Sequence, residues 1–365
     1  MGAFNGQLRT NEIFSALYNM IISQEVFADN IGEHQTLVDK ARVDGGLYGD
    51  TKLYYATDVL KSAPWGNDAE ATNLLALHRP PAPECQAISL DIFRQISLTV
   101  DNYLTKRAWS TESAFSSFNS VMLGWMKETK RVYDGTLYNV FIGTTKSAKA
   151  AQNIEIDLAA ARGDASTQEE ANRLEVECLA QSIADLLVAM GDYSREFNDY
   201  EMLRSYAKDG IKFIWNSKYV NKVRKVDLPT IFHKEGLVDK FEEEILPSRY
   251  FGNVNVADVA AGDNDGSYRS VLEKDYTVSE VVTHVFPGDF IPAGAAIEAG
   301  EGYLEDDKVI AKVLVQYPPY MSAFEVGTSF FNPKSLTENH YLTFGHNTLE
   351  YLKNYPFITI VEKSE

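Results

Sequence analysis

The sequence predicts an α+β fold, because helical and strand periodicities occupy different parts of the chain. From Ile88 to Val100, apolar and polar side chains alternate with the period of two that is typical of a half-buried β-strand. Residues 110–133 and 166–190 instead repeat apolar side chains at helical spacing. Beyond residue 254, short β-prone segments alternate with turn residues rich in Gly, Pro and Asp.

The alternating segment is too long for an ordinary strand. Unbroken, it would reach about 40 Å, whereas strands typically have about five or six residues. Only Phe93 on the polar row and Arg94 on the apolar row interrupt it. An extended segment at 53–60 and a proline-rich segment at 64–83 precede it, and prolines do not fit a central strand. We therefore expect a long two-stranded arm with an irregular tip, whose apolar row is covered by another copy of the chain. That row consists of Ile88, Leu90, Ile92, Ile96, Leu98 and Val100.

Three helices are predicted from apolar spacing and end signals. An amphipathic helix spans Asn11–Asp29, and a long one spans Ser110–Tyr133. Asp134-Gly135 is expected to end the second helix, since Gly commonly follows a helix C-terminus. The third helix opens at Ser166, where Glu169 completes a capping-box pattern.

The remaining segments are predicted to be largely β. Residues 211–215 form a short buried strand, and the last hundred or so residues are mostly strands and turns. Residues 309–315 and 357–361 are the most apolar of these segments. Pro356 lies just before the closing strand, where its missing N–H does not interrupt a ladder.

Composition restricts the class of protein. The 365 residues carry a formal net charge of -18, which disfavours tight binding to a phosphate backbone. Residues 251–310 contain twelve acids and three bases, so 12 - 3 = 9 of these negative charges are local and predict a solvated or pore-facing surface. No apolar run is long enough for a membrane helix, and Met1–Thr10 lacks the pattern of a secretion signal. Cys85 and Cys178 are predicted to be buried thiols in a reducing cytoplasm.

No catalytic, cofactor-binding or metal-ligating residue is predicted. The segment Gly143–Ser147 fails as a phosphate loop because Thr145 replaces a required glycine, so a turn is expected there. Gly300–Gly302 lacks the third glycine of a dinucleotide-binding turn. Asp263–Gly266 resembles part of a calcium loop, but the first ligand and the bidentate acid are missing, which favours a solvated turn.

Two groups of residues leave alternatives open. His340 and His346 could approach each other if they flank a turn, although surface or hydrogen-bonded histidines are the commoner case. Lys212, Lys218, Lys222, Arg224 and Lys225 form a basic run without an acid. That run could contact a polyanion, form a solvated helix face, or pair with the acidic 251–310 region of a neighbouring subunit.

The order of elements resembles that of the major capsid proteins of tailed double-stranded DNA bacteriophages, which have the Hong Kong 97-type fold. The resemblance covers nearly the whole chain but depends on shape more than on short motifs. The residues that carry it are Ile88–Leu104 followed by the helix at Phe115–Tyr133, then Asp209–Asn216, Val326–Asn332 and Leu349–Val361.

The resemblance implies a structural protein, not an enzyme. Its subunits would assemble through hexameric and pentameric capsomers into an icosahedral shell around phage double-stranded DNA, without sequence-specific DNA binding, a cofactor or a membrane. The shell would be the virion capsid, assembled in the host cytoplasm. Because no long charged helix precedes the arm, a separate scaffolding protein is expected, together with a portal. Lys52 and Lys61 lie on the expected arm, but a covalent crosslink cannot be assigned to either.

The resemblance also implies a domain organisation. The expected parts are an N-terminal arm (1–46), an extended loop (47–104), a peripheral domain with a spine helix (105–153), an axial domain (154–316) and a return to the peripheral domain (317–365).

Two alternatives remain at this stage. An encapsulin-like nanocompartment has the same fold and differs in what its shell contains. A carboxylate-dependent carbohydrate-active enzyme belongs to a different class, and acidic residues are abundant enough to allow one. Placement of 88–100 in a central sheet, instead of a projecting hairpin, would favour the enzyme.

Overall fold

The computed structural model describes residues 36–45, 50–62, 77, 79–101, 112–163, 165–220 and 242–363, leaving aside the side chains of 112–123 and 324. The expected helix at Asn11–Asp29 and most of the proline-rich segment lie outside the described residues. The chain divides into two units, each built from segments far apart in the sequence. Unit 1 comprises Met1–Asp50, Leu90–Gly135 and Tyr320–Thr348, and unit 2 comprises Thr51–Ser89, Thr136–Pro319 and Leu349–Glu365.

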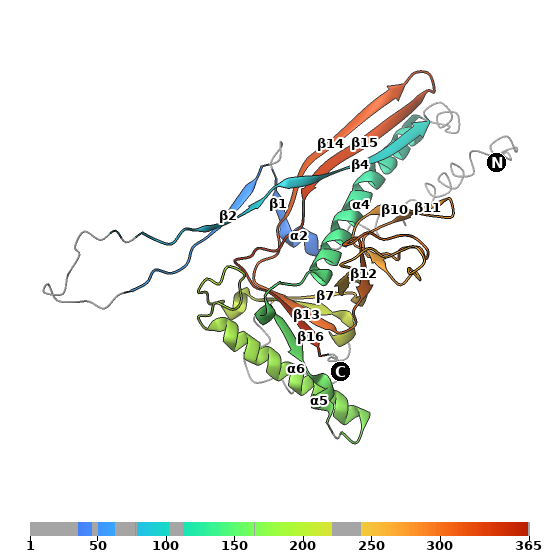
Figure 1. Ribbon diagram of the computed structural model, residues 1–365. Coiled ribbons are helices and arrows are strands. Elements are labelled where there is room, and N and C mark those ends of the chain that lie inside the picture. The colour runs from blue at the N-terminus through green and yellow to red at the C-terminus, as the bar shows by residue number, and fades with distance from the viewer. Residues whose placement is uncertain are drawn as a thin grey trace. The chain divides into compact units, whose positions relative to one another are not determined.

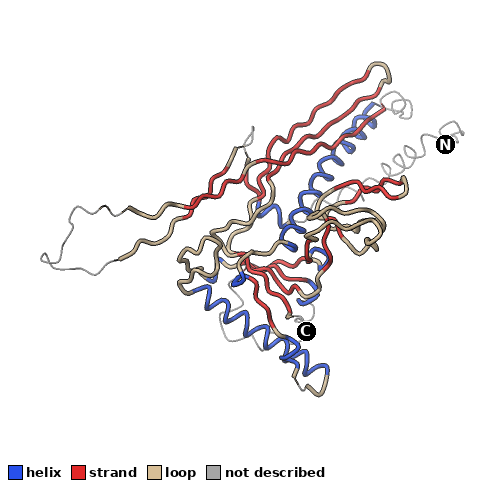
Figure 2. Tube along the Cα trace, viewed as in Figure 1, coloured by secondary structure: helices blue, strands red, loops and turns tan. Residues whose placement is uncertain are grey.

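Unit 1 is built on a four-stranded sheet. Its elements are α2 (Leu37–Ala41), β1 (Arg42–Asp44), β4 (Leu90–Asp101), β14 (Tyr320–Asn332), β15 (Thr337–Asn347) and the first part of α4 (Glu112–Thr144). The strand order is β1-β14-β15-β4, and only the β1–β14 pair is parallel (Figures 1 and 2). β4 is thus an edge strand of this sheet.

The long alternating segment is a strand, but its predicted partner is wrong. Along β4 the polar row is exposed and the apolar row is half-buried, as the period of two predicts. However, β4 pairs with β15 of the same chain, from Asp101 opposite Thr337 to Leu90 opposite Asn347. The predicted continuous strand also breaks at Ser89, where the chain passes from unit 2 to unit 1. Periodicity specifies the face that a strand buries, whereas its hydrogen-bonding neighbour is chosen by the fold.

Both interruptions of the alternation have a packing role. The Arg94 guanidinium lies 4.9 Å from the centroid of the Tyr133 ring of α4, so the half-buried row of β4 faces this helix. On the other face, Phe93 lies opposite Gly345 of β15, and a Cβ added to Gly345 would come within 3.0 Å of the Phe93 ring. An aromatic ring across a strand glycine covers backbone that has no side chain of its own.

The predicted end of the long helix is also wrong, because α4 continues through Asp134-Gly135 to Thr144. Asp134 is fully buried and accepts hydrogen bonds from Lys130 at 3.2 Å, Arg42 at 3.0 Å and the Tyr320 hydroxyl at 2.6 Å. This aspartate therefore joins α4 to β1 and β14 within unit 1. A buried carboxylate with three donors is stable inside a helix, where an exposed Asp-Gly pair would favour termination.

Unit 2 contains the larger core. Its main sheet has the order β5-β16-β13-β6-β7, and the predicted strands at 211–215, 309–315 and 357–361 are confirmed as β6, β13 and β16. The sheet strands and flanking helices are β5 (Asn153–Ile156), β6 (Lys212–Asn216), β7 (Glu242–Leu246), β13 (Val309–Leu314), β16 (Phe357–Glu362), α5 (Leu158–Arg162) and α6 (Gln168–Gly191). The apolar face of α6 packs in one cluster with β6, β13 and β16.

The start of α6 is predicted to within one residue. Thr167, not Ser166, is the N-cap, and its hydroxyl accepts a hydrogen bond from the Glu170 amide at 3.2 Å. The Glu170 carboxylate in turn accepts from the Ser166 amide at 3.0 Å. The N-cap half of a capping box is therefore present one position later than predicted, while the Glu170 carboxylate accepts from the residue before the N-cap.

The acidic segment after residue 251 forms small sheets of its own. Its strands are β8 (Gly252–Val254), β9 (Arg269–Ser270), β10 (Lys274–Val278), β11 (Val281–Val285) and β12 (Gly302–Glu305), and short 3-10 helices occur at Ala150–Gln152, Lys208–Gly210 and Ser248–Tyr250. A small apolar cluster that includes Tyr276, Ile291 and Ile297 supports this segment. The acidic segment therefore has an apolar core of its own, and its acidic side chains lie around that core.

Two strands of unit 2 that belong to neither the main sheet nor the small sheets form a separate hairpin. They are β2 (Lys52–Ala56) and β3 (Glu84–Ile88). They are antiparallel, with Lys52 opposite Ile88 and Ala56 opposite Glu84. A two-stranded arm is therefore present, and segment 53–60 provides one strand as predicted. Its second strand is β3, which ends before β4 begins. None of the described helices is long and apolar enough to cross a membrane.

Candidate functional site

The hairpin β2–β3 exposes an unusual amount of apolar surface. Leu53 and Tyr55, which share one face of β2, are 52% and 64% exposed, and Leu60 beyond the strand is 72% exposed. Leu77, on the chain that returns toward β3, is 82% exposed. An isolated two-stranded hairpin is marginally stable in water, and grouped exposed apolar side chains mark interaction surfaces.

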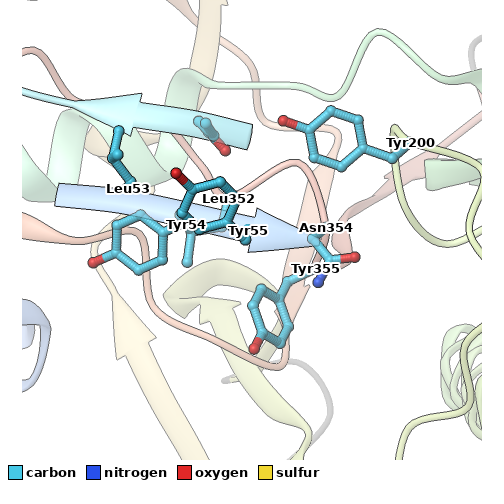
Figure 3. A pocket seen from close by; sticks show the side chains of 8 residues that line it. Leu53, Tyr54, Tyr55, Tyr200, Leu352, Asn354 and Tyr355 are labelled. Atoms are coloured by element: carbon cyan, nitrogen blue, oxygen red, sulfur yellow. The ribbon is translucent and has the colours of Figure 1, made fainter. Parts of the chain in front are cut away.

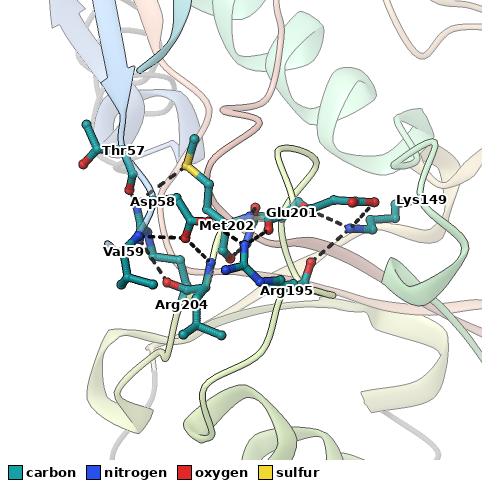
Figure 4. A network of polar contacts seen from close by, with 10 residues as sticks. Thr57, Asp58, Val59, Lys149, Arg195, Glu201, Met202 and Arg204 are labelled. Carbon is teal, nitrogen blue, oxygen red and sulfur yellow. Dashed lines mark hydrogen bonds and ion pairs between the residues drawn. The ribbon is translucent and has the colours of Figure 1, made fainter. Parts of the chain in front are cut away.

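Asp58 fixes the chain where it leaves β2 (Figure 4). Its carboxylate accepts hydrogen bonds from Arg195 at 2.6 Å and from the Leu203 amide at 3.0 Å. The Arg195 hydrogen bond, with those from the Leu203 and Val59 amides, lowers the pKa of Asp58 to about 2. Arg204 adds a hydrogen bond to the Thr57 carbonyl. This end of β2 is thereby attached to the loop 192–206.

The loop 192–206 is itself firmly held. Ser194 and Arg204 exchange backbone hydrogen bonds of 2.9 and 3.0 Å, and Asn198 closes the loop by bonding both backbone groups of Met202. Lys149 donates to the carbonyls of Arg195 and Asn198 at 3.0 and 3.2 Å. The loop is therefore a rigid support for the hairpin.

Asp199 connects this loop to the rest of unit 2. Its carboxylate accepts hydrogen bonds from Ser147 at 3.1 Å, Gln152 at 2.9 Å and the Tyr351 hydroxyl at 2.6 Å. Burial and the Asp199 carboxylate raise the pKa of Tyr351 to about 12, so its hydroxyl remains a donor.

Gln86 fixes the second strand. Its side-chain amide donates to the Tyr351 carbonyl at 3.1 Å, and its oxygen accepts from the Lys353 amide at 3.0 Å. Gln86 is buried although it lies on a two-stranded hairpin. The polar contacts thus hold β3 against the segment that follows β15, while Asp58 and Arg204 hold β2.

A shallow pocket of about 190 Å³ lies beside these contacts (Figure 3). Tyrosines from three parts of unit 2 contribute to it: β2, the loop 192–206 and the segment after β15. Burial is the main cause that raises the pKa of Tyr54 and Tyr200, so both rings present neutral hydroxyls. The pocket is lined by Leu53, Tyr54, Tyr55, Gln86, Tyr200, Leu352, Asn354 and Tyr355.

The residues tested for metal or cofactor chemistry do not come together. His340 and His346 lie on one strand, roughly 20 Å apart at about 3.4 Å per residue, so they do not flank a turn. Asp263–Gly266 is a turn, in which the Asn264 side chain bonds the Pro292 and Ala295 carbonyls. In the described ranges, no three His, Cys, Asp or Glu side chains are grouped as metal ligands would be.

Two further expectations require correction. Gly143 belongs to the last turn of α4, not to a loop, and a Cβ there would lie 2.1 Å from the Tyr250 carbonyl oxygen. Cys85 is exposed, because its strand belongs to a hairpin with one open face, whereas Cys178 is partly buried against the main core.

The basic run is partly neutralised within the chain. Lys212 contacts Glu242 at 2.7 Å, and Lys218 contacts Asp307 of the acidic segment at 2.6 Å. A pairing between the basic run and the acidic region therefore exists inside one subunit. The other members of the run, Lys222, Arg224 and Lys225, lie outside the described residues.

Sequence reasoning missed the residues that support the hairpin. Asp58, Arg195 and Arg204 belong to no periodic pattern, and Gln86 is one polar residue in a short strand. The only available signal was the tyrosine content of the segments concerned, at Tyr54-Tyr55, Tyr200 and Tyr355. Aromatic side chains that combine an apolar ring with a polar tip are common at interfaces.

Comparison with known proteins addresses the fold. No family model and no curated protein matches the sequence. A chain in the capsid structure of Staphylococcus phage Andhra matches with a TM-score of 0.58 and 10% identity, over 90% of this chain and 84% of that chain. A chain in the structure of the head fiber and inner core protein of native bacteriophage P68 matches with a TM-score of 0.55 and 11% identity, over 86% of this chain and 81% of that chain. The protein therefore has the α+β fold of phage capsid proteins, the Hong Kong 97-type fold that its order of elements predicts.

Proposed function

We propose that this chain is the major capsid protein of a tailed double-stranded DNA bacteriophage, a structural subunit that assembles into an icosahedral shell. The observation that carries the proposal is the fold, which matches a phage capsid structure over 90% of the chain. At 10% identity the likeness is one of architecture, so the contacts of this chain have to supply the rest of the argument.

The hairpin β2–β3 supports assembly on physical grounds. Its exposed apolar side chains are presented by a rigid base, so a neighbour can cover them without a prior ordering cost at that base. Burial of each such side chain contributes roughly 1.5 to 3 kcal/mol before the entropy cost of association. An uncovered hairpin would be an aggregation hazard, which makes a second subunit the natural cover.

The finer parts of the proposal follow from the same family. Subunits would form hexameric and pentameric capsomers, with a separate scaffolding protein and a portal, and would enclose DNA without reading its sequence. The protein would be located in the virion capsid, after assembly in the host cytoplasm. The chain would have no enzymatic role, and its five parts would be 1–46, 47–104, 105–153, 154–316 and 317–365.

Electron microscopy of the purified protein tests the proposal. We expect closed shells or isolated capsomers, either from the protein alone or after addition of the scaffolding protein of its phage. A monodisperse monomer under both conditions would contradict the proposal.

A paired surface variant tests the role of the hairpin. Replacing Leu60 and Leu77 by Ser removes two of its most exposed apolar side chains, so the fold is expected to persist while the yield of shells falls. Val256→Ser is the matched control, because Val256 is 95% exposed on another part of unit 2. Shell yields are measured by sedimentation. Equal yields from the Leu60/Leu77 variant and from the Val256→Ser control would show that the hairpin is not part of the assembly surface.

The shell contents separate the two assemblies that share this fold. Nuclease-protected DNA in purified particles is expected for a capsid, whereas an enclosed enzyme would indicate an encapsulin-like nanocompartment. The carbohydrate-active enzyme is not favoured. β4 does lie in a sheet, but at its edge, and the hairpin that the capsid interpretation requires is present as β2–β3.

A further inference from the structure

The chain contains an exposed proline-rich segment that suits the tyrosine pocket. Arg79–Pro83 reads Arg-Pro-Pro-Ala-Pro, is exposed throughout and has neither helix nor strand. Prolines fix φ near the value of the polyproline II helix, which has three residues per turn. Pro80 and Pro83 therefore lie on the same side of such a helix, in the spacing that aromatic grooves recognise.

The pocket has the chemistry of such a groove. Four of its eight lining residues are tyrosines and two are leucines, and Tyr55 leaves an exposed ring at its edge (Figure 3). Aromatic rings pack against the flat, rigid surface of proline with little loss of conformational entropy.

The charges of pocket and segment are complementary. The carboxylates of Glu84, Asp199 and Glu350 lie close enough to Tyr200 to raise the pKa of its hydroxyl, although burial has the larger effect. The Glu350 carboxylate also accepts a hydrogen bond from the lining residue Gln86 at 3.3 Å, so the rim of the pocket is acidic. Arg79 begins the proline-rich segment and is exposed. An Arg beside a polyproline helix would approach this rim as the prolines enter the pocket.

The segment leads away from the pocket of its own chain. Pro83 directly precedes β3, and the pocket includes Gln86 farther along the same strand. Pro81 therefore lies roughly 15 Å from Gln86 along an extended backbone, at about 3.1 Å per residue. Three prolines in four positions oppose the reversal that would return the segment to this pocket.

We propose that the tyrosine pocket of one subunit binds the proline-rich segment Arg79–Pro83 of a second copy of the chain. The inference rests on the proposed shell function, which supplies neighbouring copies at high local concentration. It adds a defined occupant and a defined recognition chemistry: prolines against tyrosine rings, and Arg79 against the acidic rim. Hairpins would thereby connect successive subunits head to tail, a heterologous contact of the kind that closes rings.

Peptide binding to the full-length protein tests the recognition directly. A fluorescent peptide with the sequence of residues 79–84 is titrated with the protein and followed by anisotropy. The matched peptide has Ala in place of Pro80, Pro81 and Pro83. We expect saturable binding of the first peptide and at least roughly tenfold weaker binding of the second, which corresponds to about 1.4 kcal/mol. Equal affinities would overturn the proposal.

Variants of the protein locate the binding site. Tyr200→Ala is expected to abolish peptide binding, while Tyr193→Ala, a control at a 74% exposed tyrosine outside the pocket, retains it. Because Tyr200→Ala could also disturb the loop 192–206, a charge exchange provides a second criterion. Glu350→Lys should weaken binding of the native peptide and favour a peptide carrying Arg79→Glu. If neither substitution alters binding, the pocket is not the site.

Assembly provides a readout that separates this inference from the shell function. Full-length Pro80→Ala/Pro83→Ala protein is expected to give fewer shells than the wild type in sedimentation. Normal shells from this variant, together with equal peptide affinities, would overturn the inference and leave the shell function intact. Absence of any assembly by the wild type would contradict the shell function, and peptide titration would still decide whether the pocket binds the segment.

Discussion

His346 shows how a single residue is fixed by its surroundings. It is fully buried in β15, between the rings of Tyr133 and Tyr320. Its Nδ1 lies 2.9 Å from the Asn347 carbonyl oxygen, which can only accept, so this nitrogen carries the proton and donates. Its Nε2 then accepts from the Tyr133 hydroxyl at 2.8 Å. Both ring nitrogens are satisfied by the neutral form.

This arrangement predicts a pH dependence of stability. Burial lowers the pKa of His346, although the Asn347 carbonyl and Asp134 act in the opposite direction; Arg94 and Lys130 lower it further. The unfolded chain binds the proton more readily than the folded one, so stability is retained above about pH 6.5 and decreases as the pH falls below it. The decrease is at most about 1.4 kcal/mol per pH unit for one group, until the pH passes the folded pKa.

Denaturant unfolding between pH 7.5 and 5.5 measures the effect. His346→Gln should be less stable overall, but its stability should depend less on pH than that of the wild type. The control His284→Gln is expected to change the pH dependence of stability in the opposite direction. The hydrogen bond that His284 donates to the Asp275 carboxylate raises the pKa of His284, so this histidine stabilises the fold at low pH and its removal should make the loss of stability in acid steeper. Identical pH profiles for the wild type and His346→Gln would contradict the assignment.

At the scale of elements, the hairpin β2–β3 depends on contacts made outside its own strands. Its ladder is short, and a hairpin of this size is marginal by itself. Asp58 at the end of β2 and Gln86 in β3 attach it to the loop 192–206 and to the segment after β15. The stability of the hairpin is therefore a property of unit 2.

Asp58→Asn is expected to loosen the hairpin without unfolding the chain. The substitution removes the charge that Arg195 pairs with while preserving the shape of the side chain, so amide exchange in Lys52–Ala56 should accelerate several-fold while α6 is unchanged. Hydrogen-deuterium exchange with mass spectrometry measures both segments. Glu196→Gln, in the loop 192–206 that Asp58 contacts, makes the same change in net charge and serves as the control. Equal exchange in the two variants would show that Asp58 does not anchor β2.

The elements also show where periodicity succeeds and where it fails. The alternation in β4 and the helical spacing in α6 predicted the buried faces, because each pattern follows from local backbone geometry. The end of α4 was missed because Asp134 is stabilised by Arg42, 92 positions away in the sequence. A local Asp-Gly signal contains no information about such a partner.

At the scale of the whole molecule, the net charge of -18 disfavours tight binding to a phosphate backbone. Two lysines of the basic run, Lys212 and Lys218, are also paired to acids of the same chain, which reduces the positive charge that this run offers to phosphates. The proposed shell of such subunits would enclose DNA without binding its phosphates tightly.

The corresponding prediction concerns free duplex DNA. Purified subunits should not shift a linear duplex in a native gel at about 0.15 M salt, where a screening length of about 8 Å leaves only close contacts effective. Lowering the salt should produce little binding, and a basic DNA-binding protein run alongside confirms that the assay detects complexes. Tight binding that weakens steeply with salt would indicate a phosphate-binding surface, with Lys222, Arg224 and Lys225 as the residues to replace first.

From the amino-acid sequence alone, the α+β class and the buried faces of β4 and α6 could be predicted, and no phosphate or metal motif was expected. These properties follow from short-range patterns of apolar and polar side chains. The pairing of β4 with β15, the composition of the hairpin from β2 and β3, and the pocket lined by tyrosines from three segments could be seen only in the folded chain. Each depends on residues far apart in the chain, such as Asp58 with Arg195 and Gln86 with Tyr351. Local periodicity fixes which side of an element is buried, whereas the partner across a ladder or an ion pair is selected by the packing of the complete fold.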